Sequence, residues 1–505
     1  MDSKLILCNN IKLDKSYANV LSFGTNAMLD LINSNKSYEQ DNYNYIDYTK
    51  NEIMADVDYN IAINCNYIAF QNPRHGNKWY FAFVDDVIYK APKQSFIKFT
   101  IDVWSTFFGD WSAKPCFVVR EHVNSDNVGE HTVPESVTLG DYVCTAHLRD
   151  IYNRDIDNYR VIISTNITPS EAQKVNWGGN FNGIPSAFAY WAYLKTDGSG
   201  IGGAINTAQT NNGNINQCFF APKWLLEYGG VSTGRVSNSE EPKMQMLTIS
   251  KITALDGYTP TNKKLLTYPY CFIKSSNGQG QEGIYHQELW SPGITGDVEL
   301  IMKGCLTPGC SIRLYPLDYA GDEISTENGI NLGKFPQLNW ATDPYVNWLT
   351  QQGVSQGMSA ITNVVSSPEP VGTGINEIGS LMYNEYKAER TPPQVFGNQN
   401  AGDVTCAMSE NCFHLYKMTI KQEYARQIDK YFSRYGYKVN DVKTPNITGR
   451  ANFNFIEIGK DDCIGYGNVP PKYMEEINNI CRQGVTIWHN HTNLGNYNVA
   501  NAIVS

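Results

Sequence analysis

The chain has 505 residues, enough for about three or four domains of ordinary size. Only 18% of its residues are charged, where about 25% is usual for soluble globular proteins. Uncharged polar residues and 32 tyrosines fill the difference. This composition suits β-strands and subunit interfaces, which bury area without stranding charge, better than it suits a compact cytoplasmic enzyme. An ordinary β-rich secreted protein is the alternative at this point.

The formal net charge of -10 excludes a protein that holds DNA through a basic face, because such binding requires Lys and Arg to displace counterions from phosphates. The twelve cysteines are too dilute for a disulfide scaffold, and several, such as Cys116 and Cys271, lie in apolar runs. We therefore expect reduced, buried cysteines and assembly in a reducing cytosol. The N-terminus has no signal-peptide core, and the longest apolar run, 187–194, is shorter than the roughly 20 residues that span a bilayer. These features predict a chain that is soluble when made.

The first 125 residues predict β-structure. Residues 96–104 alternate apolar Phe99, Ile101 and Val103 with polar residues, the period of a half-buried strand. Residues 79–84 and 117–119 are short apolar runs typical of strands. Residues 196–217 are rich in Gly, Asn and Thr and predict a long surface loop, while 297–304 and 311–315 flank a turn at 307–309 and predict a hairpin.

Two amphipathic helices are predicted near the C-terminus. The first covers 419–435, with Thr419 and Gln422 at capping-box spacing and Gly436 as its stop. Its apolar stripe is made of Tyr424, Ile428, Tyr431, Phe432 and Tyr435. The second helix opens at Pro470–Pro471, carries Met474, Ile477 and Cys481 on one face, and stops at Gly484 before a strand over 485–488. The last hundred residues therefore predict a compact α+β unit.

Several blocks of sequence, spread over most of the chain, resemble those of a known protein family and occur in the same order as in that family. They are 67–84; 101–103 with 118–123; 182–185; 268–271; 424–455, around Lys430-Tyr-Phe-Ser-Arg-Tyr-Gly-Tyr-Lys-Val439; and 484–489 with 494–499. Together these blocks resemble the tail knob, or distal tail tube, proteins of small short-tailed phages of the Bacillus picovirus type, including their streptococcal and staphylococcal relatives.

The resemblance implies a mainly β fold with a smaller α+β part, in which β-barrel-like tube domains assemble into a ring. The expected domains are an N-terminal β tube domain (1–135), an irregular β-rich middle domain (136–262), a hairpin-rich domain (263–344), a long uncharged loop (345–400) and a C-terminal α+β tube domain (401–505). It further implies a homohexamer at the distal end of the tail, in contact with proximal tail or connector proteins and with tail-tip proteins, through which double-stranded DNA passes.

The long loop is the candidate functional segment. Residues 344–368 contain no charged side chain, and only Glu369, Glu377 and Glu385 follow before Lys387. In the family the corresponding loop plugs the tube and enters the host membrane when DNA leaves; here it is shorter and less rich in Gly and Ala. Its apolar residues are the expected plug and membrane contacts, with Trp348 as an interface anchor: Trp348, Leu349, Val354, Met358, Ile361, Val364, Val365, Ile378, Leu381 and Met382. A linker, or a loop buried in an interface, is the alternative.

The other residue patterns give little indication of a metal site, a disulfide or a phosphate-binding loop. His489 and His491 with Cys463 and Cys481 match no zinc spacing and predict a strand end with polar neighbours. Cys305 and Cys310 flank a turn and could bridge only in an oxidising setting. Residues 200–204 have neither the preceding strand nor the Lys-Ser/Thr of a phosphate loop. We therefore expect no enzyme, cofactor or metal site. A tail-associated cell-wall glycan depolymerase, whose two acids need not be close in sequence, and a receptor-binding adhesin that contacts wall sugars through surface Tyr and Trp are the alternatives.

Overall fold

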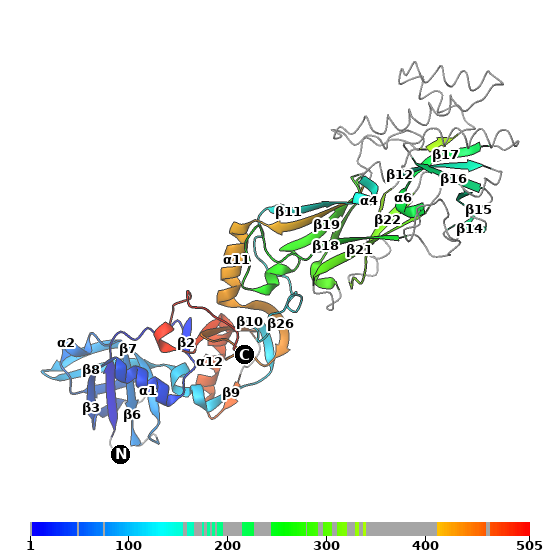
Figure 1. Cartoon of the computed structure of the whole chain (residues 1–505). Helices are drawn as coiled ribbons and strands as arrows, with labels where there is room; N and C mark the ends of the chain where they lie inside the picture. Colours follow the sequence, from blue (N-terminus) through cyan, green and yellow to red (C-terminus); the bar gives the residue numbers. More distant parts are fainter. Residues whose placement is uncertain are drawn as a thin grey trace, which may run out of the picture. The chain divides into compact units, whose positions relative to one another are not determined.

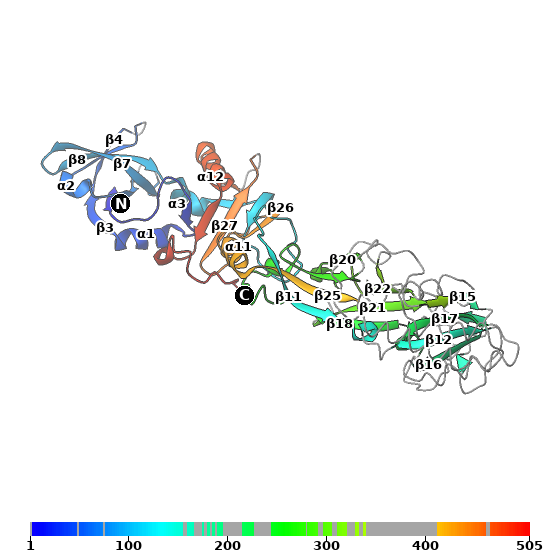
Figure 2. The ribbon, with the colours of Figure 1, turned by 90° about the horizontal axis from the view of Figure 1, so that it is seen from above.

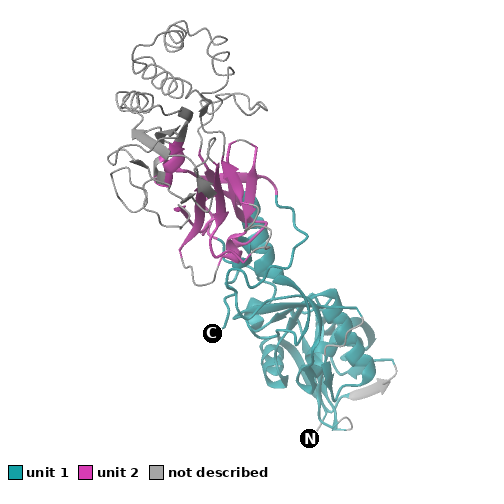
Figure 3. Ribbon diagram, turned by 90° about the vertical axis from the view of Figure 1, so that its right-hand side faces the viewer, with its two compact units in different colours: residues 1–139, 260–265, 423–505 teal, residues 140–259, 266–422 magenta. Residues whose placement is uncertain are grey.

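The computed structural model forms two compact units, coloured separately in Figure 3. Unit 1 comprises residues 1–139, 260–265 and 423–505, and unit 2 comprises 140–259 and 266–422. The chain therefore passes between the units four times, and unit 1 contains residues from both ends of the sequence. The described residues are 3–47, 50–73, 76–154, 159–165, 174–175, 179–181, 184–186, 189–194, 215–226, 244–278, 280–290, 296–305, 311–320, 329–332, 337–339, 412–460 and 465–504.

Unit 1 is built on a seven-stranded antiparallel sheet (Figure 1). Its order is β3 (Lys36–Asp41), β1 (Lys4–Cys8), β6 (Tyr67–Gln71), β7 (Trp79–Ala91), β8 (Gln94–Ile101), β5 (Glu52–Ala55) and β4 (Asn44–Asp47). Residues 5–8 of β1 and 67–70 of β6 are buried on both faces of the sheet, which explains why they read as continuous apolar runs. Strand β8 alternates buried and half-buried residues along its whole length, as its period of two predicts.

Helices cover both faces of this sheet. Helix α1 (Thr25–Ser34) packs Met28, Leu31 and Ile32 against one face, and its place beside β3 is visible in Figure 2. The other face packs against α3 (Val103–Phe107), which contributes Trp104 and Phe107 to the larger core. The short helix α2 (Tyr59–Ala62) adds Ala62 to the same core.

A second, five-stranded sheet joins the two ends of the chain. Its order is β2 (Asn19–Leu21), β29 (Val485–Trp488), β27 (Phe453–Ile458), β10 (Cys116–Glu121) and β26 (Tyr437–Lys443), with β2 parallel to β29. A two-stranded ribbon of β9 (Trp111–Ala113) and β28 (Gly465–Gly467) makes a further connection between the ends. Helix α12 (Pro471–Gln483) buries Ile477, Ile480 and Cys481 in the same core as Val118 and Ile456.

Unit 2 consists of four further sheets. A four-stranded sheet has the order β11 (Tyr142–Arg149), β25 (His414–Ile420), β19 (Cys271–Ser276) and β20 (Glu282–Tyr285). A second four-stranded sheet has the order β18 (Met244–Ser250), β21 (Asp297–Cys305), β22 (Ser311–Pro316) and β23 (Ile330–Leu332). The others are a five-stranded sheet of β13 (Lys174–Val175), β16 (Ala189–Leu194), β12 (Tyr159–Thr165), β17 (Ile215–Pro222) and β24 (Gln337–Asn339), and the pair β14 (Gly179–Phe181) and β15 (Ile184–Ser186). The short helices α4 (Ile151–Arg154) and α6 (Lys223–Leu226) connect strands.

Most predicted elements are present, and the mainly β fold class is confirmed. The hairpin is β21 paired with β22, with its turn outside the described residues, and the strand over 485–488 is β29. Of the predicted loop 196–217, the last three residues belong to strand β17, and residues 196–214 lie outside the described residues.

Two predicted boundaries are wrong. The strand predicted over 96–104 ends at Ile101, because the buried side chain of Asp102 accepts a hydrogen bond from the Ser105 backbone N–H and starts α3 there. The helix predicted from Thr419 begins instead at Gln422, as α11 (Gln422–Tyr435), since Thr419 belongs to strand β25. Asp256, rather than a capping box, accepts the backbone N–H of Gln422 at 3.1 Å.

The predicted stop of α11 at Gly436 is confirmed, and it generates a test. Gly436 has a φ of +66°, and a Cβ there would lie 2.1 Å from the carbonyl oxygen of Glu121. We expect Gly436→Ala to lower the free energy of unfolding by more than the roughly 1–2 kcal/mol of left-handed strain alone. Gly76→Ala is the matched control, because Gly76 has a φ of +71° and no atom within 4 Å of its would-be Cβ. Equal losses in urea unfolding for both variants would contradict the close approach.

Candidate functional site

The meeting of the two chain ends in unit 1 is the candidate functional region. Two buried indoles connect residues near the N-terminus to the rest of the unit: Trp104 Nε1 donates to the Leu21 carbonyl at 2.9 Å, and Trp488 Nε1 donates to Asn19 Oδ1 at 2.8 Å. His489 lies at the end of β29 with its ring nitrogens 2.9 Å from Ser22 Oγ and 2.8 Å from Asn454 Oδ1. These contacts hold β2, β27 and β29 in one layer.

His122 follows β10 directly and is buried beneath helix α11. Its Nδ1 accepts the Phe455 backbone N–H at 2.8 Å, so its proton lies on Nε2, which donates to the Ser433 carbonyl at 3.1 Å. Burial, together with the positive charge of Arg450, lowers the pKa of His122 to about 3. His122 is therefore a neutral crosslink between β10, β27 and α11.

Glu135 is the centre of a buried ionic network. Its side chain is fully buried and accepts from Lys264 Nζ at 2.7 Å, from the Lys438 backbone N–H at 2.8 Å and from Arg120. Burial by itself would raise the pKa of Glu135, but these hydrogen bonds and the two cations outweigh it and hold that pKa below its usual value. Removing one partner from such a buried pair costs about 3–5 kcal/mol, because the other charge stays buried.

Two further carboxylates hold the short segment 260–265 inside unit 1. Asp429 accepts the backbone N–H groups of Thr261 and Asn262, each at 2.9 Å. Asp126 accepts the backbone N–H of Lys263 at 3.1 Å and the hydroxyl of Tyr437 at 2.8 Å. This segment is therefore held by polar contacts to its backbone as well as by the burial of Leu265.

These polar networks were not visible in the sequence, because most of their contacts join residues that lie more than a hundred positions apart. One signal was present. The buried residues of α11 are Ala425, Ile428, Asp429 and Phe432, so an aspartate interrupts an otherwise apolar stripe. A charge in that position requires a buried partner, here the segment 260–265.

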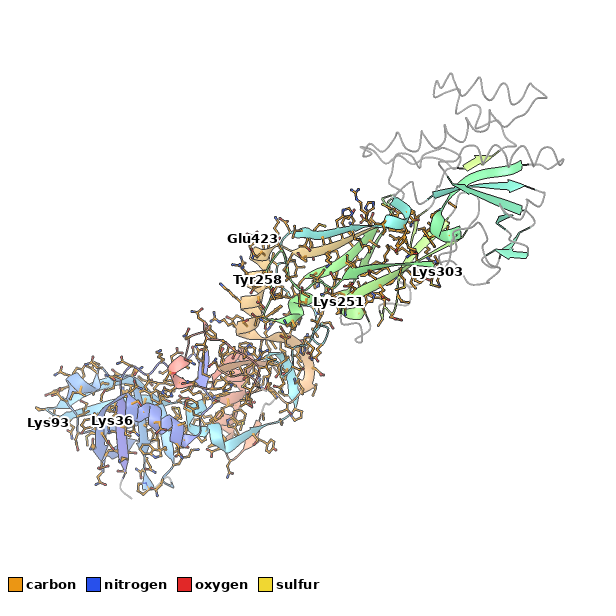
Figure 4. The ribbon with its side chains drawn as sticks, in the orientation of Figure 1. Lys36, Lys93, Lys251, Tyr258, Lys303 and Glu423 are labelled. Atoms are coloured by element: carbon orange, nitrogen blue, oxygen red, sulfur yellow. The ribbon has the colours of Figure 1, made fainter. Side chains whose placement is uncertain are left out.

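The outer surfaces of unit 1 are suited to contact with other chains. Strand β3 is the exposed end of the seven-stranded sheet; Figure 4 labels its residue Lys36 and Lys93 of the turn between β7 and β8. Strand β26 ends the five-stranded sheet, and its Val442 is 66% exposed. Edge strands present backbone donors and acceptors that a strand of another chain can use. On the outer face, Phe96 pairs with Met54 on one side and Ile88 on the other, which forms a half-buried apolar row.

The predicted plug and membrane residues all lie outside the described residues: Trp348, Leu349, Val354, Met358, Ile361, Val364, Val365, Ile378, Leu381 and Met382. The same holds for residues 200–204 and for Cys310 and Cys463. Cys116, Cys271 and Cys481 are buried, as predicted, whereas Cys144 is exposed. Within the described ranges no helix is long and apolar enough to cross a membrane, and no group of three potential metal ligands occurs.

The neutral state of buried His122 predicts a pH dependence. A histidine in the unfolded chain takes up a proton below about 6.5, whereas folded His122 does so only near 3. The stability that depends on neutral His122 is therefore complete above about pH 6.5 and falls, by up to about 1.4 kcal/mol per pH unit, as the pH drops toward 3. His122→Gln keeps a donor and an acceptor but does not titrate, so its urea midpoint should fall less between pH 7 and pH 4. Equal slopes for the two proteins would contradict this account.

Comparison with known proteins finds relatives of this chain by sequence and by fold. The chain is similar to the tail knob protein gp9 of Bacillus phage phi29, with 24% identity and 92% of each chain covered. It is similar to the gp9 proteins of Bacillus phages PZA (24% identity, 90% of each chain) and B103 (22% identity, 87% of this chain and 88% of that one). The solved structure of the bacteriophage C1 tail knob protein, gp12, has the same fold, with a TM-score of 0.62 at 14% identity over 100% of both chains.

Two family models match the segments that meet in unit 1. Residues 1–112 match the Caudoviral major tail protein N-terminus, and residues 235–502 match the C-terminal domain of the Bacillus phage phi29 tail knob protein gp9. The second match alone covers more than half of the 505 residues. The chain therefore belongs to the family of phi29-type tail knob proteins, which are structural proteins of the phage tail.

Proposed function

We propose that six copies of this chain form the distal tail tube, or knob, of a short-tailed bacteriophage, and that the tube is the conduit for genome ejection. In this proposal the tube is assembled in the host cytoplasm and contacts proximal tail or connector proteins and tail-tip proteins. Double-stranded DNA passes through it. The relatives are structural tail proteins, and we propose in line with them that the chain has no enzymatic activity.

One observation carries the proposal: the segments that match tail-protein families at both ends of the chain share one core. The N-terminal segment contributes the seven-stranded sheet, and the C-terminal segment contributes β26, β27 and β29 to the adjoining sheet and α12 to the shared core. This leaves β3 and β26 as strand edges at the ends of the two described sheets. A ring of subunits uses a different surface patch on each side, which two separate edges can supply.

The net negative charge of the chain supports the proposal that DNA passes through the tube. With a net charge of -10, the protein as a whole repels DNA. We propose a lumen that is neutral to negative and free of Lys or Arg rings, because each cation that contacts a phosphate would slow the passage of DNA by counterion release.

We propose that the loop 345–395 gates the channel before ejection and enters the host cytoplasmic membrane afterwards. Single copies carry too many polar groups, among them Gln351, Gln352 and Gln356, to cross hydrocarbon as one helix. Six copies could turn those groups toward water in a common pore. Acid would neutralise Glu369, Glu377 and Glu385 and ease partition into the bilayer.

The ring is tested by native mass and by negative-stain images of the purified chain. We expect a species of six times the mass of one chain and particles with a central channel. A monomer at micromolar concentration, or compact particles without a channel, would overturn the tube. Release of reducing sugar from bacterial cell walls by the same preparation would favour the alternative, a glycan depolymerase.

The loop is tested by dye release from liposomes. We expect intact protein to release more dye at pH 5 than at pH 7, and protein lacking residues 350–390 to release little at either pH. The deletion variant must still form the ring, which separates the role of the loop from assembly. Equal leakage from both proteins, or none from either, would leave the loop as a gate that does not enter lipid.

A further inference from the structure

One face of the sheet β11–β25–β19–β20 in unit 2 is partly exposed: on β19 and β25 its side chains are half-buried, except that of Phe272, which is buried. In β19 and β25 the residues of the inner face are almost completely buried: Cys271, Ile273, Ser275, Leu415 and Thr419. The residues between them point to the opposite face, where they pair across the two strands as Phe272 with Met418, Lys274 with Tyr416 and Ser276 with His414. Figure 1 shows β11 and β19 in this layer. We call the outward side the aromatic face.

Four rings gather at one end of the aromatic face. Tyr142 and Tyr268 are 38% and 42% exposed, and both contact Phe272, with ring centroids 5.3 Å and 6.0 Å away. The ring of Tyr268 lies flat on that of His286 at 4.0 Å, with 10° between the planes. The hydroxyl of Tyr142 donates to the Pro269 carbonyl at 2.9 Å. These rings are therefore fixed in place before any ligand arrives.

A second group of rings lies further along the same strands. His147 of β11 pairs in register with Tyr416 of β25, and their rings stack at 4.5 Å with 14° between the planes. Nε2 of His147 lies 3.0 Å from Nδ1 of His414. His147 is five positions after Tyr142, which is roughly 15 Å of strand, and a register shift between Cys144 and Ala146 brings both to the same face. The aromatic face is therefore long enough for an extended ligand.

Two lysines at the aromatic face are paired with carboxylates, and Arg149 is a third cation near Tyr416. Lys274 forms an ion pair with Glu282 at 2.8 Å, and Lys421, which follows β25, pairs with Asp141 at 2.8 Å. A polyanion would require a large excess of cations, which two ion pairs and one arginine do not provide. The ion pairs and the imidazoles supply donors and acceptors around the rings. Flat rings with polar groups at their margins match a neutral ligand that is flat and rich in hydroxyl groups.

We propose that the aromatic face of unit 2 binds a carbohydrate polymer, such as the glycan of a bacterial cell wall. Sugar rings lie on Tyr142, Tyr268 and Tyr416, and their hydroxyl groups bond to the ion pairs and imidazoles beside them. No bond is broken, because the role is adhesion. The rings lose little freedom on binding, since they are held by Phe272 and His286. This activity is separate from the conduit, and gives a tail protein affinity for the surface that its DNA must cross.

The test uses the full-length protein and two probes, insoluble peptidoglycan and the soluble oligomer chitohexaose. We expect peptidoglycan to retain the wild-type protein, chitohexaose to compete, and calorimetry to give a measurable affinity. The double variant Tyr142→Thr, Tyr416→Thr keeps strand propensity but removes a ring from each group, and should bind about tenfold more weakly. Tyr142→Phe keeps the ring and should retain binding.

Tyr466→Thr is the matched control, because Tyr466 is an exposed tyrosine on strand β28 in unit 1. It should bind both probes as the wild type does. Equal thermal unfolding of all variants shows that loss of binding is not loss of fold. Absence of wild-type retention on both probes, or wild-type affinity in the double variant, would overturn the proposal. Ring formation is measured separately, so failure of the tube leaves this result unaffected.

Discussion

The burial of apolar surface shared by the two ends of the chain is the constraint on which unit 1 depends. Ile456, Ile477 and Ile487 belong to the same core as Leu5, Ile68 and Val118, although hundreds of residues separate them. Neither end could bury these side chains alone, because β10 has a C-terminal strand on each side, β27 and β26. The apolar side chains of the shared core are therefore fully buried only when the C-terminal segment is in place.

Polar groups add specificity where apolar packing would allow several arrangements. Glu135 fixes Lys264 and Arg120 in one geometry, and Asp429 fixes the backbone of residues 261 and 262. Such buried charges contribute little net stability compared with apolar residues of similar volume, but an incorrect register would leave them unpaired at a large cost. In the segment 260–265 the burial of Leu265 does not by itself fix the register, whereas the carboxylates bond to particular backbone N–H groups.

Local patterns predicted local structure well and long-range structure poorly. The period of β8, the hairpin of β21 and β22 and the stop at Gly436 are each encoded within about twenty residues, and each is present. The start of α11 was wrong, because its first N–H is capped by Asp256, which no spacing rule links to Gln422. For the same reason the neutral crosslink at His122 could not be read from its neighbours. The resemblance to tail knob proteins supplied the family that the periodicity could not, while the loop residues 345–395 remain a prediction.

The topology also shows how the two ends can meet. Pairing β10 with β26 joins Cys116 to Lys443 across more than three hundred residues, and closing a flexible loop of that length costs about 5 kcal/mol. Within unit 2, however, Tyr142 pairs with Ile420 at the start of the β11–β25 ladder. Once that ladder forms, the open loop between β10 and β26 shrinks to some fifty residues, and the closure cost falls by roughly 2 kcal/mol. Formation of the β11–β25 ladder in unit 2 thus lowers the entropy cost of pairing β10 with β26 in unit 1. Folding of the middle of the sequence favours closure of unit 1, and unit 1 is complete only after nearly all of the chain has been made.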